Sequence, residues 1–314
     1  MVIGAGQAGL SVSFYLKRLG LEPGSDFVLL DRGPGTGGAW QHRWEALRIG
    51  SAHHINDLPG MDEIGISFDS ADRSLPAKDV VADYYARYEA HYELQVRRPV
   101  DVKRVFNRGT DLVVGFEASG GIGALETDVV VNATGTWGSP FVPWYPGLND
   151  FAGRHVHTTQ YDSAADFAHY LVAKNFRVDL SYRKPELSRM NDINLADLRG
   201  MAAAGRLEFL MPTDITGIEA DAGRPRAMFQ QVEPRVYDHV VYALGGSTPA
   251  GFLQSTGIDL KGGEPVLGEG GATNVRGLFL AGDLTVGKKG GSIISAFNSG
   301  VRTMRVILRE QLLS

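Results

Sequence analysis

Three glycines near the start of the sequence have the spacing of a phosphate-binding turn. Gly4, Gly6 and Gly9 follow a short apolar run and precede a helix-like apolar pattern over residues 10–19. Glycine at these positions permits a tight turn, a close approach of the backbone to a diphosphate, and close packing of a helix on a strand. The free N–H groups and partial positive charge at the start of the helix also favour an anion. The spacing therefore predicts a strand, turn and helix that hold the diphosphate of a dinucleotide.

An acidic residue follows at the distance expected for a ribose contact. Asp31 ends the apolar run over residues 27–30, which is typical of a buried strand, and it lies 22 residues after Gly9. In dinucleotide-binding βαβ units a carboxylate at this place binds ribose hydroxyls. Arg32 stands beside it as a further candidate contact. The pattern predicts a nucleotide site, but this motif alone does not choose between NAD and FAD.

Three later motifs make that choice. Residues 35–40 are glycine-rich and end in tryptophan, residues 133–135 form an Ala-Thr-Gly turn after an apolar run, and residues 282–283 are a Gly-Asp pair after another. In this order the motifs resemble those of the two-dinucleotide-domain flavoprotein oxidoreductases. Within them the chain is most similar to the flavin-containing monooxygenase group, through residues 37–40 and 134–137. The resemblance covers nearly the whole chain and implies FAD as the cofactor.

The resemblance also implies a set of FAD contacts. Gly38 and Trp40 would lie near the ribityl chain and the isoalloxazine, with plain core packing as the alternative for Trp40. Val102 would hold adenine through backbone groups, with a simple β-strand as the alternative. Asp283 would bond the ribityl or diphosphate region. The FAD-binding residues expected from the glycine motif and the resemblance are Gly4, Gly6, Ala8, Gly9, Asp31, Arg32, Gly38, Trp40, Val102, Ala133, Thr134, Gly135, Gly282, Asp283, Ser292 and Ile293.

The last of these residues open a long helix that we expect from residue 292 to 313. The resemblance places the start of this helix beside the pyrimidine edge of the flavin, which carries negative charge when reduced. A helix N-terminus stabilises such a charge by about 0.3–1 kcal/mol. Ser292 and the backbone amides from Ile293 onward are the donors that we expect there.

The middle of the chain is expected to bind the nicotinamide nucleotide. Residues 155–161 resemble the crossover segment of the family, and residues 176–183 have the pattern of a strand that ends in Arg183. The resemblance implies that Arg183 binds the 2′-phosphate of NADPH, because a guanidinium matches phosphate oxygens in geometry and charge. NADPH is therefore expected in preference to NADH.

The second glycine motif of the family is missing from this region. Residues 162–174 contain no glycine, although the resemblance predicts a strand and a glycine turn near them. Two interpretations stay open: the protein has lost the loop that binds the nicotinamide phosphates, or the sequence omits a segment here. We favour omission, because Arg183 would otherwise have no purpose. A true loss would make NADPH binding doubtful.

Candidate catalytic residues lie in residues 48–60, the segment that relatives place over the flavin. His53 and His54 depart from the common Ser-Pro pattern of the family. Histidines titrate near neutral pH and can act as acid or base, with structural hydrogen bonding as the alternative. Asn56 is a candidate for contact with the flavin edge. We expect no metal site, because no third ligand stands at a suitable spacing.

The composition excludes several other classes of protein. The 314 residues contain no cysteine, which excludes a disulfide framework, a thiolate metal site and a redox-active dithiol such as that of thioredoxin or glutathione reductases. A net charge of −5 without a long basic run argues against nucleic-acid binding. No stretch approaches the roughly 18 apolar residues of a membrane span, and the start lacks the basic region of a signal peptide, so we expect a cytoplasmic protein. The opening strand is short, which suggests that a few upstream residues are absent.

We therefore predict an α/β fold with a Rossmann-like FAD-binding domain over residues 1–147 and 247–314. A smaller NAD(P)-binding domain without its glycine loop, residues 148–246, would interrupt it. The expected function is hydride transfer from NAD(P)H to FAD, followed by monooxygenase-like oxidation of a small nucleophilic or carbonyl substrate with molecular oxygen. Two alternatives are reduction of a non-disulfide acceptor, and an FAD-binding sensor without catalysis. The substrate and the oligomeric state are not readable from the sequence.

Overall fold

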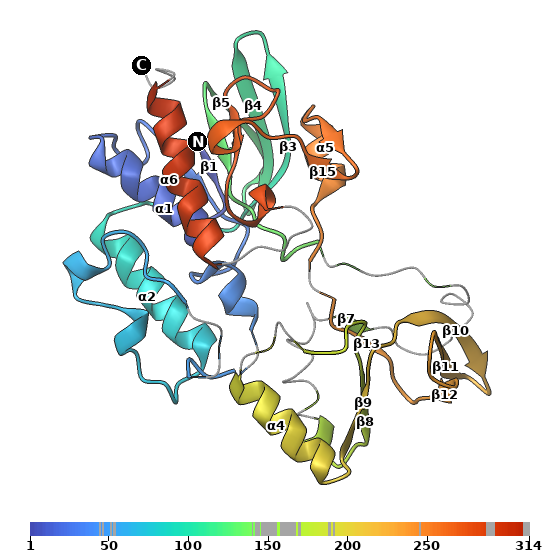
Figure 1. Ribbon diagram of the computed structural model, residues 1–314. Coiled ribbons are helices and arrows are strands. Elements are labelled where there is room, and N and C mark those ends of the chain that lie inside the picture. The colour runs from blue at the N-terminus through green and yellow to red at the C-terminus, as the bar shows by residue number, and fades with distance from the viewer. Residues whose placement is uncertain are drawn as a thin grey trace. The chain divides into compact units, whose positions relative to one another are not determined.

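The protein is described from a computed structural model of residues 1–314 (Figure 1). The structure describes residues 1–43, 45, 47–50, 52, 55–139, 141, 145, 156–157, 168, 171–187, 190, 192–244, 246–286 and 293–309. The chain divides into two compact units. Unit 1 comprises Met1–Ser139 with Gly246–Ser314, and unit 2 is Pro140–Gly245. The domain boundaries expected from the sequence, and the nucleotide assigned to each domain, stay predictions.

A four-stranded parallel sheet forms the centre of unit 1. Its strands, in spatial order, are β16 (Leu278–Leu280), β6 (Val130–Asn132), β1 (Val2–Ile3) and β2 (Leu29–Leu30). All four are fully buried, as expected for parallel strands covered on both faces. Val2 is paired with Leu29 on one side and Val131 on the other. The strand predicted over residues 27–30 is limited to β2, because the Phe27 carbonyl closes a turn by accepting from Gly24 N at 2.7 Å.

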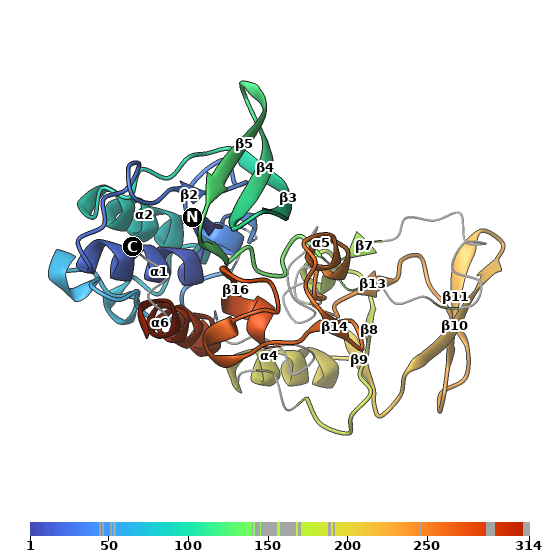
Figure 2. The same ribbon diagram turned by 90° about the horizontal axis from the view of Figure 1, so that it is seen from above.

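Two helices pack side by side in unit 1, α1 (Gln7–Arg18) and α6 (Ile293–Arg309) (Figures 1 and 2). The small residue Gly300 permits their close approach. A Cβ atom at this position would lie 3.3 Å from both Ala8 O and Val12 Cγ2. The first turn of α1 is thereby held against α6, which fixes the glycine motif at its start.

Helix α2 (Ala77–His91) buries one apolar face against the same core. Val81, Tyr85 and Tyr88 on this face are all fully buried. Phe14 of α1 packs edge-on against Tyr92, with ring centroids 5.1 Å apart. Aromatic pairs of this kind add to the area that the rings bury, so they fix α2 beside α1.

The other elements of unit 1 surround this core. An antiparallel sheet is built from β3 (Val100–Arg108), β4 (Asp111–Ala118) and β5 (Gly121–Thr127). The short elements are η1 (Gly38–His42), η2 (Asp62–Ile64), η3 (Phe68–Ser70), α5 (Ala250–Ser255), β14 (Leu260–Lys261), β15 (Glu264–Pro265), η4 (Glu269–Gly271) and η5 (Gly282–Thr285). Of these, η1 and η5 carry residues of the candidate site.

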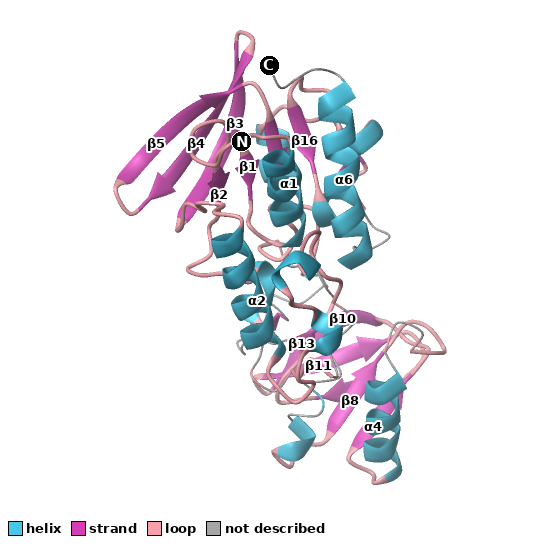
Figure 3. Ribbon diagram, turned by 90° about the vertical axis from the view of Figure 1, so that its left-hand side faces the viewer, coloured by secondary structure: helices cyan, strands magenta, loops and turns pink. Residues whose placement is uncertain are grey.

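Unit 2 contains a parallel strand pair covered by a helix (Figure 3). Strands β8 (Val178–Ser181) and β9 (Leu207–Leu210) are joined through α4 (Asp192–Ala203), and Leu180 and Leu198 lie in their shared core. The strand expected over residues 176–183 is therefore present, but shorter. Unit 2 also holds the antiparallel strands β10 (Ile215–Asp221), β11 (Arg224–Phe229) and β12 (Arg235–Val236), and the parallel pair β7 (Val156–His157) and β13 (Val241–Tyr242).

An ion-pair network ties the two main sheets of unit 2 together. Arg235 of β12 contacts Asp179 of β8 at 2.9 Å and Glu208 of β9 at 2.8 Å. Tyr237 donates to the same Asp179 carboxylate at 2.8 Å.

Within the described part of the chain, no helix has the length and apolar composition that a membrane crossing requires.

Candidate dinucleotide-binding site

The glycine motif forms a turn that no other residue type fits. Gly4 has φ +99°, and a Cβ atom on it would lie 2.5 Å from Ala133 O. A Cβ atom on Gly9 would lie only 1.8 Å from Gly4 O. Both distances are far inside van der Waals contact, so glycine is required for the turn and for the helix that packs over it. The predicted roles of these two residues in shaping the turn follow from this geometry.

The start of α1 is open to an anion. Gly6 is the N-cap residue, no side chain caps the helix, and no acidic residue occupies its first turn. Its free N–H groups and its dipole therefore meet no negative side chain of the helix itself. Within the described part of the chain, a Cβ atom on Gly6 would meet only Gly38 Cα, at 3.9 Å. No Cβ atom covers the backbone at Gly6, so a diphosphate could approach its N–H groups closely.

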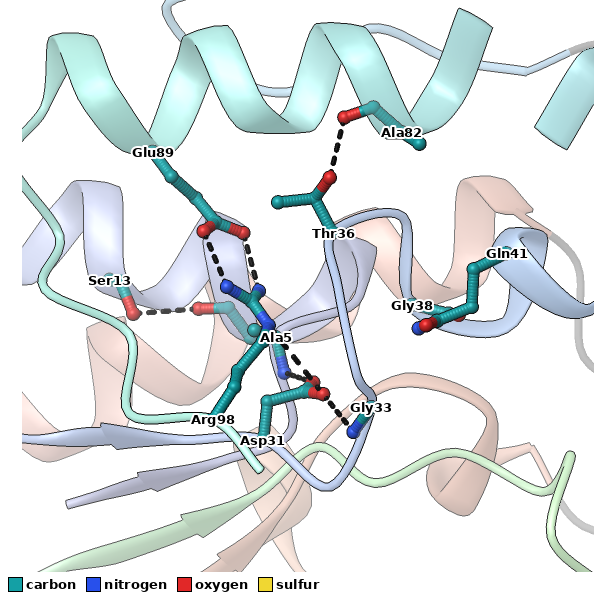
Figure 4. Close-up of polar contacts among 11 residues, drawn as sticks. Ala5, Ser13, Asp31, Gly33, Thr36, Gly38, Gln41, Ala82, Glu89 and Arg98 are labelled. Carbon is teal, nitrogen blue, oxygen red and sulfur yellow. Dashed lines mark hydrogen bonds and ion pairs between the residues drawn. The ribbon is translucent and has the colours of Figure 1, made fainter. Parts of the chain in front are cut away.

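A second glycine turn lies directly against the first. Gly38 opens η1 with φ +54°, and a Cβ atom on it would lie 2.8 Å from Gly6 Cα. Gln41 Nε2 donates to Gly38 O at 2.8 Å, and Thr36 Oγ1 donates to Ala82 O of α2 at 2.7 Å (Figure 4). The predicted contact residue Gly38 is thus held beside the phosphate turn by η1 and by α2.

Asp31 lies at the end of β2 and braces the glycine turn. Its residue exposure is 7%, and its Oδ2 accepts a hydrogen bond from Ala5 N at 2.6 Å. Oδ1 accepts from Gly33 N, also at 2.6 Å. A carboxylate has about four lone-pair sites, so these two bonds leave acceptor capacity for a ribose diol. Sequence analysis did not foresee that the same carboxylate orders the turn.

The turn after β6 is ordered by an asparagine that sequence analysis missed. Asn132 is 1% exposed, and its Oδ1 accepts from the amide and hydroxyl of Thr134 at 3.2 and 2.9 Å. Gly135 follows with φ +67°, and a Cβ atom there would have no neighbour within 4 Å among the residues that the structure describes. The sequence feature that could have identified Asn132 is a polar residue at the end of an otherwise apolar strand. The predicted residues 133–135 thus form an ordered turn with one open side.

The Gly-Asp pair after β16 reaches the same region. Gly282 N donates to Ser299 Oγ of α6 at 2.6 Å, and a Cβ atom on Gly282 would lie 3.1 Å from Ala8 Cβ. Asp283 is largely buried, and burial raises its pKa, while the positive charge of Arg43 acts in the opposite direction. Gly282 thus lies against the predicted contact residue Ala8 in the first turn of α1, and Asp283 follows it in the chain.

Aromatic and cationic side chains gather beside η1. The Arg43 guanidinium lies 4.4 Å from the ring centroid of Trp137 and 5.5 Å from that of Trp40. Cation–π contacts of this kind hold planar groups in place. The pKa of His42 is lowered, first by burial and then by the positive charge of Arg32. The predicted Trp40 is therefore part of a cluster rather than an isolated core residue, and Arg43 was not foreseen.

These observations fit FAD as a ligand of unit 1. The first turn of α1 contains no acidic residue, and Asp31 retains acceptor capacity. The side-chain nitrogen Nδ2 of Asn56 is buried and has no hydrogen-bond partner among the described residues, and Gln7 Nε2 donates to Asn56 O at 3.3 Å. An unpaired buried donor close to the start of α1 calls for an acceptor. In the described residues no group of three or more His, Asp or Glu side chains could hold a metal ion.

Comparison with known proteins decides the family. The profile of the pyridine nucleotide-disulphide oxidoreductases matches residues 1–282. The chain belongs to this family. An α/β fold with Rossmann-type FAD- and NAD(P)-binding domains, FAD as the cofactor class, and the character of an oxidoreductase enzyme are thereby confirmed.

Curated proteins similar in sequence match about half of the chain. The uncharacterized oxidoreductase CzcO of Bacillus velezensis is 26% identical over 171 residues, which are 54% of this chain and 45% of that protein. A probable indole-3-pyruvate monooxygenase, YUCCA4 of Arabidopsis thaliana, is 29% identical over 179 residues, 55% of this chain and 39% of its own. The matched part of the chain thus spans less than half the length of these relatives.

Solved structures match the fold over nearly the whole chain. A flavin-containing monooxygenase from Stenotrophomonas maltophilia has a TM-score of 0.72 at 24% identity, covering 98% of this chain and 97% of its own. A bacillithiol disulfide reductase from Bacillus cereus has a TM-score of 0.76 at 18% identity, with 98% of both chains covered. At these identities the comparison establishes the fold of this family member and nothing finer.

Several other predicted site residues of this oxidoreductase lie on further elements or outside the described part of the chain. Val102 lies on β3, half-buried, and Arg183 is exposed just after β8. Ile293 is the first residue of α6. Predicted residues that lie outside the described part of the chain are His53, His54 and Ser292, together with residues 162–167 and 169–170 of the glycine-free segment 162–174.

Proposed function

We propose that the protein is an FAD-dependent oxidoreductase that takes hydride from NAD(P)H and oxidises a small nucleophilic or carbonyl substrate as a monooxygenase. The observation that carries this proposal is the bare, positively polarised turn at Gly6, bordered by the carboxylate of Asp31. A diphosphate and a ribose diol are the groups that such a pair of features fits.

Each part of the turn region has a role in holding the cofactor. The amides at the start of α1 would bind the diphosphate, and Asp31 would accept from the ribose hydroxyls. Asn56 would donate its unpaired Nδ2 hydrogen to a flavin or phosphate acceptor. The open side of Gly135 leaves room for the dinucleotide backbone. Bound FAD would supply two-electron transfer and reaction with oxygen, so the protein needs to bind, orient and shield rather than to add a nucleophile.

Two features favour oxygenation over thiol chemistry. The sequence contains no cysteine, so these 314 residues hold no dithiol that could pass electrons to a disulfide. Relatives include proteins named as monooxygenases, among them a Baeyer-Villiger monooxygenase of Streptomyces coelicolor that is 29% identical over 177 residues. In the overall reaction, NADPH, a proton, oxygen and the substrate would give NADP⁺, water and the oxygenated product.

The nicotinamide nucleotide is assigned to unit 2. Arg183 is exposed directly after the carboxyl end of β8, the end of a parallel strand at which ligands bind in α/β folds. A guanidinium there suits the 2′-phosphate of NADPH. Tyr182 and Lys184 are its sequence neighbours, and Lys184 is also exposed, which would add positive charge for the same phosphate.

The experiment that tests the proposal uses the purified full chain loaded with FAD. The expected result is a yellow protein whose flavin absorbance disappears on anaerobic mixing with NADPH and returns in air. An oxygenated product should then form from a thioether, a tertiary amine or a ketone. A protein that remains colourless with FAD contradicts the cofactor, unbleached flavin contradicts the hydride donor, and reoxidation without product contradicts oxygenation.

A second candidate, an FAD-binding sensor without NAD(P)H chemistry, is favoured by one observation. Residues 162–174 contain no glycine where the family has its second phosphate loop. The same mixing experiment separates the two candidates. A sensor would bind FAD tightly, and NADPH would neither bleach the flavin nor bind in calorimetry.

A further inference from the structure

A buried arginine connects Asp31 to helix α2 behind the proposed ribose site. Arg98 Nη1 and Nη2 donate to the two carboxylate oxygens of Glu89 at 2.8 and 2.6 Å. Its Nε lies 3.9 Å from Asp31 Oδ1 (Figure 4). The side chains of Arg98, Glu89 and Asp31 are only 13%, 12% and 9% exposed. The three groups therefore form a buried row of alternating charge.

The arginine is aimed at Asp31 by its pairing with Glu89. A guanidinium that uses both Nη atoms on one carboxylate is fixed in its plane, because the pairing is bidentate. Nε of Arg98 is buried and has no hydrogen-bond partner in the part of the chain that the structure describes. At 3.9 Å its interaction with Asp31 is an ion pair rather than a hydrogen bond. Arg98 therefore faces Asp31 without blocking its lone pairs.

The other contacts of Asp31 fix the same carboxylate from the opposite side. Ala5 N and Gly33 N each occupy one oxygen, and both donors belong to turns that would surround the nucleotide. The Asp31 carboxylate thus has two backbone donors and the Arg98 guanidinium as partners. Glu89 uses one hydrogen on each Nη of Arg98, which fixes the guanidinium plane beside Asp31.

Helix α2 links this row to the second glycine turn. Ala82 O accepts from Thr36 at the loop before Gly38, and Glu89 lies seven residues further along α2, on the same face of the helix. One helix thus orders both the carboxylate and the loop that flanks the phosphate turn. Sequence patterns around residues 98–99 gave no indication of this role.

We propose that Arg98, held by Glu89, is a positioning residue that fixes the Asp31 carboxylate for the adenosine ribose of FAD. This inference rests on the proposed function, in which Asp31 binds that ribose. It predicts that Arg98 contributes to FAD affinity through the ribose hydroxyls and not through the rest of the cofactor.

The test compares FAD with its analogue whose adenosine lacks both ribose hydroxyls, each titrated into the apoprotein by flavin fluorescence. The wild-type chain should prefer FAD by at least about tenfold, since hydrogen bonds to a charged group are stronger than those between neutral groups. Arg98→Lys should weaken FAD binding by about tenfold while changing the affinity of the analogue little. Non-additivity of this kind isolates an effect that passes through the hydroxyls.

Controls make the outcome decisive. Arg108→Lys alters an exposed ion pair between Arg108 of β3 and Glu126 of β5, and it should change neither affinity. Glu89→Gln should shift the preference in the same direction as Arg98→Lys but less, and it decides the matter if Arg98→Lys does not fold. Equal weakening of both ligands, or no weakening, overturns the inference while the wild-type preference still supports the role of Asp31. A wild-type chain that binds neither ligand, or both equally, overturns the proposed role of Asp31 and the inference with it.

Discussion

At the scale of single residues, the clearest dependence is on Gly9. Replacing it by alanine would place a Cβ atom 1.8 Å from Gly4 O, so the turn or the helix must move. We expect Gly9→Ala to lower the free energy of unfolding by about 1–3 kcal/mol or more, as overpacking does, and to abolish FAD binding. Urea unfolding and FAD titration measure both effects.

The matched control is Gly251→Ala in α5, where a Cβ atom would have no neighbour within 4 Å. Because alanine is a better helix former than glycine, this change should leave stability unchanged or raise it by up to about 1 kcal/mol. A Gly9→Ala protein as stable as this control would contradict the steric account of the turn.

Asp283 is a second residue whose chemistry can be tested alone. Burial raises its pKa in the folded apoprotein above the ordinary value, so the folded state retains the proton more readily than the unfolded state does. Stability from this group is therefore present at low pH and is lost as the pH rises through its folded pKa. We expect Asp283→Asn to stabilise the apoprotein at neutral pH and to remove this part of the pH dependence.

The pH dependence is measured by thermal unfolding of both apoproteins from acid to neutral pH. The same substitution should weaken FAD binding if the carboxylate contacts the cofactor, so stability and affinity should change in opposite directions. Parallel stability curves for Asp283→Asn and the wild-type chain would show that burial of this carboxylate has no thermodynamic consequence.

At the scale of elements, α6 is held to the site by one buried hydrogen bond. Ser299 Oγ accepts from Gly282 N at 2.6 Å, and Ser299 is 8% exposed. Ser299→Ala leaves that amide unsatisfied, which should cost about 1–3 kcal/mol of stability and weaken FAD binding. Ser255→Ala, at an exposed hydroxyl of α5, is the matched control and should be near neutral in urea unfolding. Equal effects of the two substitutions would contradict a special role for the bond to Gly282.

The part of the site that could be predicted from the sequence is the part that lies within one local group of elements. The glycine turn and Asp31 are local in sequence, since their roles follow from one strand–turn–helix–strand unit, and they could be predicted. Arg98 and Asn132 act through contacts that only the folded chain brings together, and no local pattern marks them. Strand lengths were also overestimated, because β2 begins only at Leu29, after a turn in which the Phe27 carbonyl accepts from Gly24 N.

At the scale of the whole molecule, the proposed function requires both units to act on one hydride transfer. Unit 1 carries the features that fit FAD, and unit 2 carries Arg183 as the candidate contact for the 2′-phosphate. If this division holds, Arg183→Ser should raise the NADPH concentration needed for half-maximal flavin bleaching by about tenfold or more, since a charge-assisted phosphate contact is lost. Reduction by NADH, which lacks that phosphate, should change little, and so should the affinity for FAD.

The Arg183→Ser test is specific because it should affect reduction by NADPH and not reduction by NADH. Arg226→Ser, at an exposed arginine of β11 in the same unit, removes the same charge elsewhere and should leave both nucleotides unaffected. A loss for NADPH alone, seen only with Arg183→Ser, would assign the phosphate to the end of β8 despite the glycine-free segment before it. Equal reduction rates for NADPH and NADH in the wild-type chain would instead mean that unit 2 does not read the 2′-phosphate, and Arg183 would then have no part in the choice of hydride donor.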